Sequence, residues 1–200
     1  KAENPFGGPS YFEVMVALAY YLFQREAVDV AVVEVGLGGS IDATNVIESQ
    51  VAVLTNVGLD HTAILGDTIE EIITDKAGII KPNQMVVSGV QQPGPRRIVA
   101  ERCRAKNATL WQLGENFICE VHSTRCFSLS MPGQRYQKLK LGMKGDFQLS
   151  NAACATAAVC ALPGFEVPER AIRQGLQQAQ MPGRMEIVQQ NPLVILDAAH

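Results

Sequence analysis

The amino-acid sequence predicts an α/β fold, in which a mostly parallel β-sheet is flanked by helices and carries a small antiparallel β-sheet. Apolar, β-branched runs alternate with helical segments in the first half of the chain, which is the pattern of parallel strands joined by helices. Between residues 107 and 145, short alternating segments are separated by glycine, proline and serine, which is typical of antiparallel hairpins. We therefore expect an α/β body with an antiparallel subdomain at residues 107–145.

The composition is that of a globular protein and excludes several classes of function. The 200 residues are 47% hydrophobic and 18% charged, which is enough apolar material to bury one good core. The formal net charge is −3 and no basic run occurs, so neither nucleic acid nor a membrane surface is an expected partner. No apolar run reaches the length of a membrane span. Five cysteines without C-x-x-C spacing favour free thiols in a reducing cytosol, so we expect a cytoplasmic protein.

The order of elements follows from apolar periodicity and from helix-capping patterns. Ser10 and Glu13 form a capping box that opens a helix at residues 11–26. Thr68 and Glu71 form a second capping box, and the helix that it opens ends at Gly78. The remaining predicted helices are residues 93–106, 147–161 and 168–180. The predicted strands are residues 30–35, 50–57 and 85–90 in the parallel sheet, 109–113, 116–122, 124–131 and 136–143 in antiparallel hairpins, and 185–190 and 193–197 near the end.

A carboxylate and three glycines lie where the first predicted strand ends. Glu34 is near the end of the apolar run, and Gly36, Gly38 and Gly39 follow shortly after it. Open α/β sheets bind ligands at such strand ends, so Glu34 is either a ligand-site carboxylate or a solvent-facing strand end. A dinucleotide-binding turn fits poorly, because Ile41 stands at the third glycine position and the next strand follows too soon for a helical crossover.

Glu34, His61 and Lys76 are candidates for a cation site. Glu34 and His61 each follow a predicted parallel strand, and the carboxyl ends of neighbouring strands face one crevice. A carboxylate and an imidazole there can hold a divalent cation, whereas the alternative for His61 is ordinary loop polarity. Lys76 falls on the apolar face of its helix. It either extends off the helix end into solvent, or is a desolvated amine that can take up carbon dioxide and become a carbamate ligand for a metal.

Polar residues in the last third of the chain allow two interpretations. Gln148 and Asn151 lie in the first turn of a predicted helix, where they either cap the helix or contact an adenine edge. Arg184 follows a Pro-Gly pair and is either a surface charge or a phosphate clamp. Asp197 and His200 follow the last predicted strand, and the strand-end argument places them at the same crevice.

Six stretches of the sequence together resemble one family. They are SYFEVMVA (10–17), EVGLGGSIDATN (34–45), TNVGLDHTAILGDTIEEIITDKAGIIKP (55–82), GDFQLSNAA (145–153), PGR (182–184) and DAAH (197–200). In this order they are similar to the folylpolyglutamate synthase and dihydrofolate synthase family, within the Mur ligase superfamily. The resemblance implies a P-loop NTPase-like central domain and ATP-dependent amide ligation. In that reaction ATP phosphorylates a carboxylate to an acyl phosphate, which the amino group of L-glutamate attacks.

The resemblance also implies the metal site and the catalytic residues. Glu34 and His61 are implied as Mg²⁺ ligands, and Lys76 as a carbamylated lysine that helps to hold a second Mg²⁺. Lys76, His61 and Arg184 are the implied catalytic residues. These roles suit phosphoryl transfer, because cations neutralise the charge on the phosphoryl group.

Contacts with ATP and with the acceptor substrate are implied in the same way. Gln148 and Asn151 are implied at the adenine, Asp197 at the ribose, and Arg184 and His200 at the phosphates. The positions implied beside the pterin of folate or dihydropteroate are Asp42, Thr44 and Asn45.

Some features depart from the family pattern. Ser40 stands where a larger residue, often arginine, is expected, and DAAH replaces the commoner DGAH. The phosphate-binding pattern G-x-x-x-x-G-K-[ST] does not occur in the 200 residues. We expect that loop before Lys1 and a glutamate-binding domain after His200. Residues 1–200 are therefore expected to be a partial central ATP-binding domain that does not catalyse the ligation alone.

The sequence thus predicts a cytoplasmic, monomeric ligase that uses ATP and Mg²⁺ to add L-glutamate to dihydropteroate, to folates or to both. The alternatives are a Mur-type ligase acting on a cell-wall precursor, a non-catalytic nucleotide-binding module and a Rossmann oxidoreductase. The DKAGIIKP stretch argues against the first alternative. The second predicts that alanine at Glu34 and Lys76 leaves function unaffected, and the third predicts nicotinamide binding.

Overall fold

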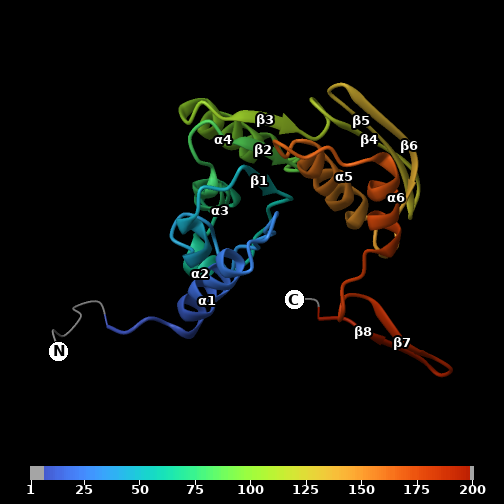
Figure 1. The fold of residues 1–200 in the computed structure, drawn as a ribbon, viewed down its shortest axis with the longest axis horizontal. Helices are drawn as coiled ribbons and strands as arrows, with labels where there is room; N and C mark the ends of the chain where they lie inside the picture. The colour runs from blue at the N-terminus through green and yellow to red at the C-terminus, as the bar shows by residue number, and fades with distance from the viewer. Residues whose placement is uncertain (1–6, 199–200) are drawn as a thin grey trace.

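Three parallel strands form the centre of the structure, a computed structural model that describes residues 7–198 (Figure 1). Strand β1 pairs in parallel with β2, and β2 pairs in parallel with β3. Helix α3 lies between β1 and β2 in the chain, α4 lies between β2 and β3, and the two helices pack on each other. The bounds are Val51–Leu54 for β1, Met85–Ser88 for β2, Thr109–Gln112 for β3, Ile69–Lys76 for α3 and Pro93–Ala105 for α4.

Both predicted capping boxes are confirmed. At the start of α1 (Tyr11–Arg25), the Ser10 hydroxyl accepts from the backbone N–H of Glu13, and the Glu13 carboxylate accepts from the backbone N–H of Ser10. Thr68 and Glu71 make the same reciprocal bonds at the start of α3. None of the helices within residues 7–198 is long and apolar enough to cross a membrane.

The prediction that residues 109–113 form an antiparallel hairpin segment is wrong. β3 joins the parallel sheet as an edge strand, because α4 is long enough to return the chain beside β2 in the same direction. The antiparallel sheet begins later and has the order β4-β5-β6. Its strands are β4 (Ile118–Ser123), β5 (Cys126–Met131) and β6 (Gln134–Lys140).

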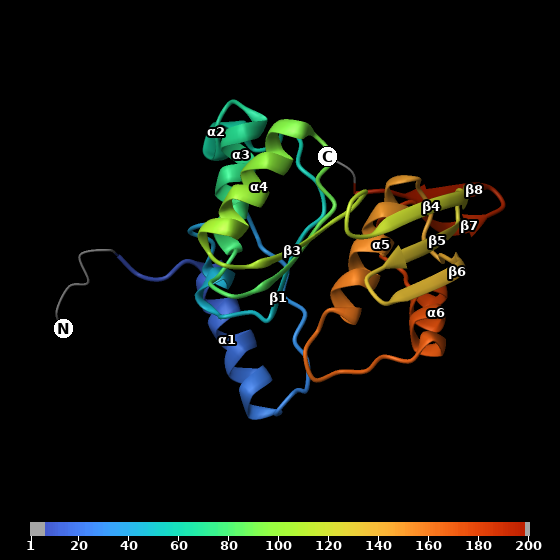
Figure 2. The ribbon, with the colours of Figure 1, turned by 90° about the horizontal axis from the view of Figure 1, so that it is seen from above.

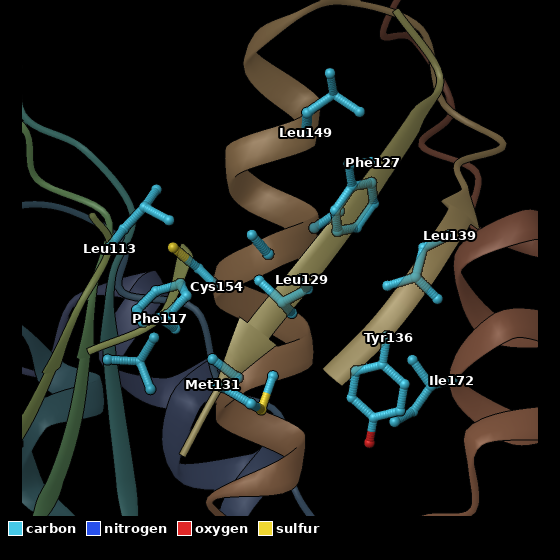
Figure 3. Close-up of a cluster of buried hydrophobic side chains, with 14 of the residues drawn as sticks. Leu113, Phe117, Phe127, Leu129, Met131, Tyr136, Leu139, Leu149, Cys154 and Ile172 are labelled. Atoms are coloured by element: carbon cyan, nitrogen blue, oxygen red, sulfur yellow. The ribbon is translucent and has the colours of Figure 1, made fainter. Parts of the chain in front are cut away.

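Helix α5 (Phe147–Cys160) lies between the two sheets (Figures 1 and 2). Its alanine-rich sequence lets both sheets approach closely, and its buried Cys154 packs beside Gly89 at the end of β2. Figure 3 shows Phe127 and Leu129 of the antiparallel sheet turned toward α5 in a common apolar core. Helix α6, at Glu169–Gln178, packs on β6 at the far side of this core.

A second core joins the parallel sheet to α3 and α4. Ile72 and Ile73 of α3, Val86 of β2 and Val99 of α4 have no exposed surface. Burying each such side chain stabilises the fold by roughly 1.5–3 kcal/mol. The position of α3, and therefore of its last residue, is fixed by this core.

The strand predicted at residues 30–35 is not formed. These residues are extended, but no backbone among residues 7–198 pairs with them as a strand. Val30 and Val32 are accordingly 46% and 93% exposed, rather than buried as the apolar run predicted. A strand requires a partner for its backbone N–H and C=O groups, and an apolar run by itself does not supply one.

The last two predicted strands are confirmed. β7 (Glu186–Gln190) and β8 (Leu193–Leu196) pair only with each other, as an antiparallel hairpin. The hairpin lies apart from the parallel sheet (Figure 1), and every residue of β8 is exposed. The apolar run of β8 is thus exposed, because the placement of a strand in a sheet depends on pairing partners that the local sequence does not specify.

Candidate active site

Asp42 organises the glycine-rich loop at residues 36–45. Its carboxylate accepts hydrogen bonds from the backbone N–H of Leu37 (2.9 Å) and from the backbone N–H and hydroxyl of Thr44 (2.9 and 2.5 Å). Asp42 thereby caps the short 3₁₀-helix η1 (Ala43–Val46). Burial would raise the pKa of Asp42, but the hydrogen bonds outweigh burial and hold the pKa below its usual value. The loop is therefore built around an ionised carboxylate.

Tyr20 connects this loop to α1. Its hydroxyl donates to the carbonyl oxygen of Thr44 at 2.7 Å, and Thr44 is itself buried. Burial, and then the negative charge of Asp42, raise the pKa of Tyr20, so the hydroxyl keeps its proton at neutral pH. The bond to Thr44 is thus present under physiological conditions.

The loop packs directly on the carboxyl end of α3, where Lys76 is the last residue. A Cβ atom on Gly39 would lie 2.8 Å from the carbonyl oxygens of Asp75 and Lys76 and 2.9 Å from the Cα of Lys76. A Cβ atom on Gly78 would lie 2.6 Å from the Cα of Ser40. The Ser40 hydroxyl donates to the carbonyl oxygen of Asp75 at 3.0 Å. These glycines therefore serve a close contact between two protein segments, and that contact brings the loop beside Lys76.

Lys76 is half-buried. Its exposure is therefore intermediate between the two alternatives that its helix position allows, a fully solvated and a fully desolvated amine. The neighbouring Asp75 has one carboxylate oxygen, Oδ2, that is buried without a hydrogen-bond partner among the described residues. Gly38, with a φ of +71°, lies against this oxygen. An unpaired buried carboxylate oxygen is unfavourable until water or a cation completes it. The sequence did not single out Asp75, because an acidic residue in the last turn of a helix has no distinctive pattern.

Glu34 and His61 are both exposed. Glu34 lies in the extended segment that leads into the loop, and His61, with a φ of 52°, stands at the start of α2 (Thr62–Leu65), with its Nε2 3.7 Å from Asp60 Oδ2. Within residues 7–198, no three His, Cys, Asp or Glu side chains are grouped closely enough to hold a metal ion. Magnesium usually takes one or two protein carboxylates and fills its other positions with water and phosphate oxygens. The Glu34 carboxylate therefore fits magnesium in donor type, whereas the His61 imidazole is a less usual ligand for it, and the two residues do not form a closed protein cage.

Gln148 and Asn151 form a pair in the first turn of α5. The side-chain amide of Asn151 donates to Oε1 of Gln148 at 3.1 Å, and Gln148 is only 9% exposed. The two amides are thus held in a fixed relation, which is an arrangement that can recognise the donors and acceptors of a base edge.

Arg184 and Asp197 both lie at the base of the β7–β8 hairpin. Nη1 of Arg184 donates to the carbonyl oxygen of Ala198 at 2.7 Å, and the backbone N–H of Met185 donates to Oδ1 of Asp197 at 3.4 Å. Because the hairpin lies apart from the parallel sheet, the structure does not bring these residues to the ends of its strands (Figure 1). His200 lies outside the described residues.

Comparison with known proteins defines the class to which this arrangement belongs. Residues 12–159 match the family of Mur ligase middle domains, and the chain belongs to this family. Similar proteins are the dihydrofolate synthase/folylpolyglutamate synthases of Bacillus subtilis (strain 168), 35% identical over 208 residues, and of Escherichia coli (strain K12), 38% identical over 191 residues. These matches cover 99% and 96% of this chain but 48% and 44% of the relatives. The chain thus spans about half the length of the curated relatives it matches.

Solved structures with the same fold belong to the same group of enzymes. A folylpolyglutamate synthase complex with AMPPCP and folate has a TM-score of 0.90 at 36% identity, and the match covers 96% of this chain and 49% of that chain. E. coli FolC in complex with DHPP and ADP has a TM-score of 0.87 at 38% identity, and covers 96% and 45%. The predicted fold class and the resemblance to folylpolyglutamate and dihydrofolate synthases are confirmed.

Proposed function

We propose that the chain is the central ATP-binding part of a ligase that joins L-glutamate to dihydropteroate, to folates or to both. The observation that carries this proposal is the contact of Gly39 with the backbone of Lys76. This contact brings the loop at residues 36–45, which we propose faces the pterin, against Lys76, which we propose acts at the phosphates. A ligase needs these two regions in contact, because the substrate carboxylate must meet the transferred phosphoryl group.

The proposed reaction has two steps. A carboxylate oxygen of the substrate attacks the γ-phosphorus of ATP, and ADP leaves with the electrons of the broken bond. The amino group of L-glutamate then attacks the acyl carbon, loses a proton and displaces phosphate. The loop around Asp42 would orient the substrate, and the close packing at Gly38 and Gly39 would hold the loop against α3.

Magnesium is the cation that we propose for this site, with two ions as the expected number. Glu34, His61 and Lys76, the last as a carbamate, would hold it. When bound, magnesium would neutralise charge on the phosphoryl oxygens. The half-burial of Lys76 and the unpaired Oδ2 of Asp75 beside it support a site that is completed by a cation.

ATP would lie along the other proposed positions. Gln148 and Asn151 would contact the adenine, which their mutual hydrogen bond supports because it fixes both amides. Asp197 would contact the ribose, and Arg184 and His200 the phosphates. The shared location of Arg184 and Asp197 at one end of the hairpin supports a joint role for them.

We also propose that the protein is a cytoplasmic monomer. All five cysteines are free, which suits a reducing compartment. Burial raises the pKa of Cys103 and Cys119 to about 11 and, together with the charge of Cys119, that of Cys154 to about 12, so these thiols stay protonated and unreactive at neutral pH. Sedimentation velocity of the purified protein tests the monomeric state.

The experiment that tests the proposed function is ATP-dependent transfer of labelled L-glutamate by the gene product that contains these residues. Dihydropteroate, folate and a muropeptide precursor are supplied in separate reactions. We expect an amide product with one or both pteroate substrates, and one ADP and one phosphate for each amide formed. Product from the muropeptide alone would identify a cell-wall ligase instead. Nucleotide binding without any amide product would identify a binding module.

A further inference from the structure

Two side chains join the glycine-rich loop to the segment that follows Lys76. The side-chain amide of Asn45 donates to the carbonyl oxygens of Ser40 (3.1 Å) and Gly78 (3.3 Å). The Nζ atom of Lys81 donates to the carbonyl oxygen of Asn45 at 2.8 Å. One residue of the loop is therefore held from both sides, through its amide group and through its backbone.

We propose that Asn45 and Lys81 are positioning residues that clamp the loop at residues 36–45 onto the end of α3 and onto η2 (Ala77–Ile79). The clamp sets the position of the substrate side of the site relative to Lys76. Its catalytic consequence rests on the proposed function, whereas the clamp itself rests on the hydrogen bonds alone.

The clamp is anchored to the rigid sheet. The backbone N–H of Lys81 donates to Oε1 of Gln84 at 2.8 Å. The side-chain amide of the buried Gln84 in turn donates to the carbonyl and hydroxyl oxygens of Ser49, just before β1, at 2.7 and 2.6 Å. Lys81 therefore reaches the loop from a fixed base, and its bond to a carbonyl is strengthened by the charge of the amine.

The packing around the clamp allows the loop only one register. Gly39 and Gly78 touch backbone atoms of the opposing segment with no space for a Cβ atom. A small slide of the loop would therefore create clashes and would also stretch both bonds of the Asn45 amide. Packing and hydrogen bonding thus favour the same position, which is the condition for a well-defined site.

The same contacts limit what Asn45 can offer a ligand. A side-chain amide has two N–H donors, and acceptors at Ser40 and Gly78 use both. Only its Oδ1 atom remains available to a substrate. Asn45 is therefore better suited to holding the loop than to donating hydrogen bonds to a pterin.

Hydrogen exchange tests the clamp without any ligand. The backbone amides of Leu37, Thr44 and Asn45 are hydrogen-bonded in the docked loop. Lys81→Met removes the donor to the loop, and we expect these amides to exchange at least about tenfold faster, since a charged hydrogen bond is lost. Asn45→Asp, which keeps the shape but removes the amide donors, should act in the same direction. Lys81→Arg, which keeps a charged donor, should restore slower exchange.

The matched control is Lys140→Met, because Lys140 is exposed on the distant antiparallel sheet. It should exchange like the unmodified protein. Unchanged exchange in Lys81→Met, with the loop as protected as in the control, would overturn the clamp. Because this measurement uses neither ATP nor substrate, it decides the clamp even if the gene product makes no amide and the proposed function fails.

Kinetics test the positioning role. In the gene product that contains these residues, Lys81→Met should lower kcat for glutamate ligation by about tenfold. The dissociation constant for ADP should stay unchanged, because Gln148 and Asn151 are proposed to bind the nucleotide. Faster exchange with an unchanged kcat would overturn the positioning role. For Asn45→Asp, a raised KM for the pteroate with normal exchange would instead identify Asn45 as a direct substrate contact and overturn its part in the clamp.

Discussion

Gly39→Ala is the substitution that most directly tests whether the glycine-rich loop serves a close contact. The added Cβ would lie 2.8 Å from the carbonyl oxygens of Asp75 and Lys76. Ordinary contacts begin at 3.4 Å, so the loop or the helix end must move by about 0.6 Å, the difference between these distances. Backbone atoms cannot rotate away as a flexible side chain can, so the contact must open.

The expected cost follows from the size of this clash. Overpacking in a dense region typically costs about 1–3 kcal/mol. For a chain of this size that corresponds to a decrease in Tm of roughly 2–12 °C. Because the displaced segment carries Lys76, glutamate ligation by the gene product should fall by more than the loss of folded protein explains.

The assay is thermal unfolding of the purified chain, combined with the ligation assay on the gene product. Gly175→Ala in α6 is the control, because no neighbouring atom lies within 4 Å of the position that its added Cβ would take. Alanine is favoured over glycine inside a helix, so this variant should gain about 0.5–1 kcal/mol. A Gly39→Ala protein that melts and ligates like the unmodified protein would refute the close-contact interpretation.

Three further outcomes are expected from urea or chemical-probe experiments. Asp42→Asn should lose about 1–3 kcal/mol of unfolding free energy at neutral pH, because a backbone donor loses its acceptor. The folded pKa of Asp42 lies below the reference value of 3.8, so its contribution to the unfolding free energy is present above that pH and is lost as the pH falls through the folded pKa. An equal loss of unfolding free energy in Asp42→Asn at neutral and at strongly acidic pH would contradict the assignment. Tyr20→Phe should lose about 0.5–1.5 kcal/mol with its bond to Thr44, and unchanged stability would argue against that bond. Cys103 and Cys154 should react with a disulfide reagent only on unfolding, and rapid labelling of the native protein would show that they are not buried thiols of high pKa.

Local signals in the sequence predicted the elements whose stability is local. The capping boxes at Ser10 and Thr68 opened helices as expected, and the apolar runs at β1 and β2 formed parallel strands. Lys76 lies on the apolar face of its predicted helix, and in the structure it is a half-buried residue at the end of α3. These features depend on residues a few positions apart, which a sequence displays directly.

The errors concern features that depend on distant partners. The run at residues 30–35 had the composition of a buried strand, yet strand formation needs a neighbouring backbone that no described residue provides. The alternating pattern around residues 109–113 predicts a hairpin, but α4 returns the chain so that this segment pairs in parallel with β2 at the edge of the sheet.

The glycine-rich loop shows the same limit at the site itself. Gly38 and Gly39 resemble glycines that approach a ligand, but in the structure they approach the end of α3. The substrate role of Asn45 stays a prediction, and the structure adds that both N–H groups of its side-chain amide already bond to Ser40 and Gly78. Spacing in the sequence indicates that a close approach occurs, and only the fold shows what is approached.

The central claim is that Lys76, held beside the glycine-rich loop, acts at the phosphates in glutamate ligation. The most direct measurement is kcat for ATP-dependent transfer of labelled L-glutamate in Lys76→Ala, compared with Lys140→Ala on the exposed face of β6. We predict a loss of at least about 100-fold in Lys76→Ala, which is typical when a group that stabilises transition-state charge is removed, with ADP affinity unchanged. A kcat equal to that of Lys140→Ala would contradict the claim.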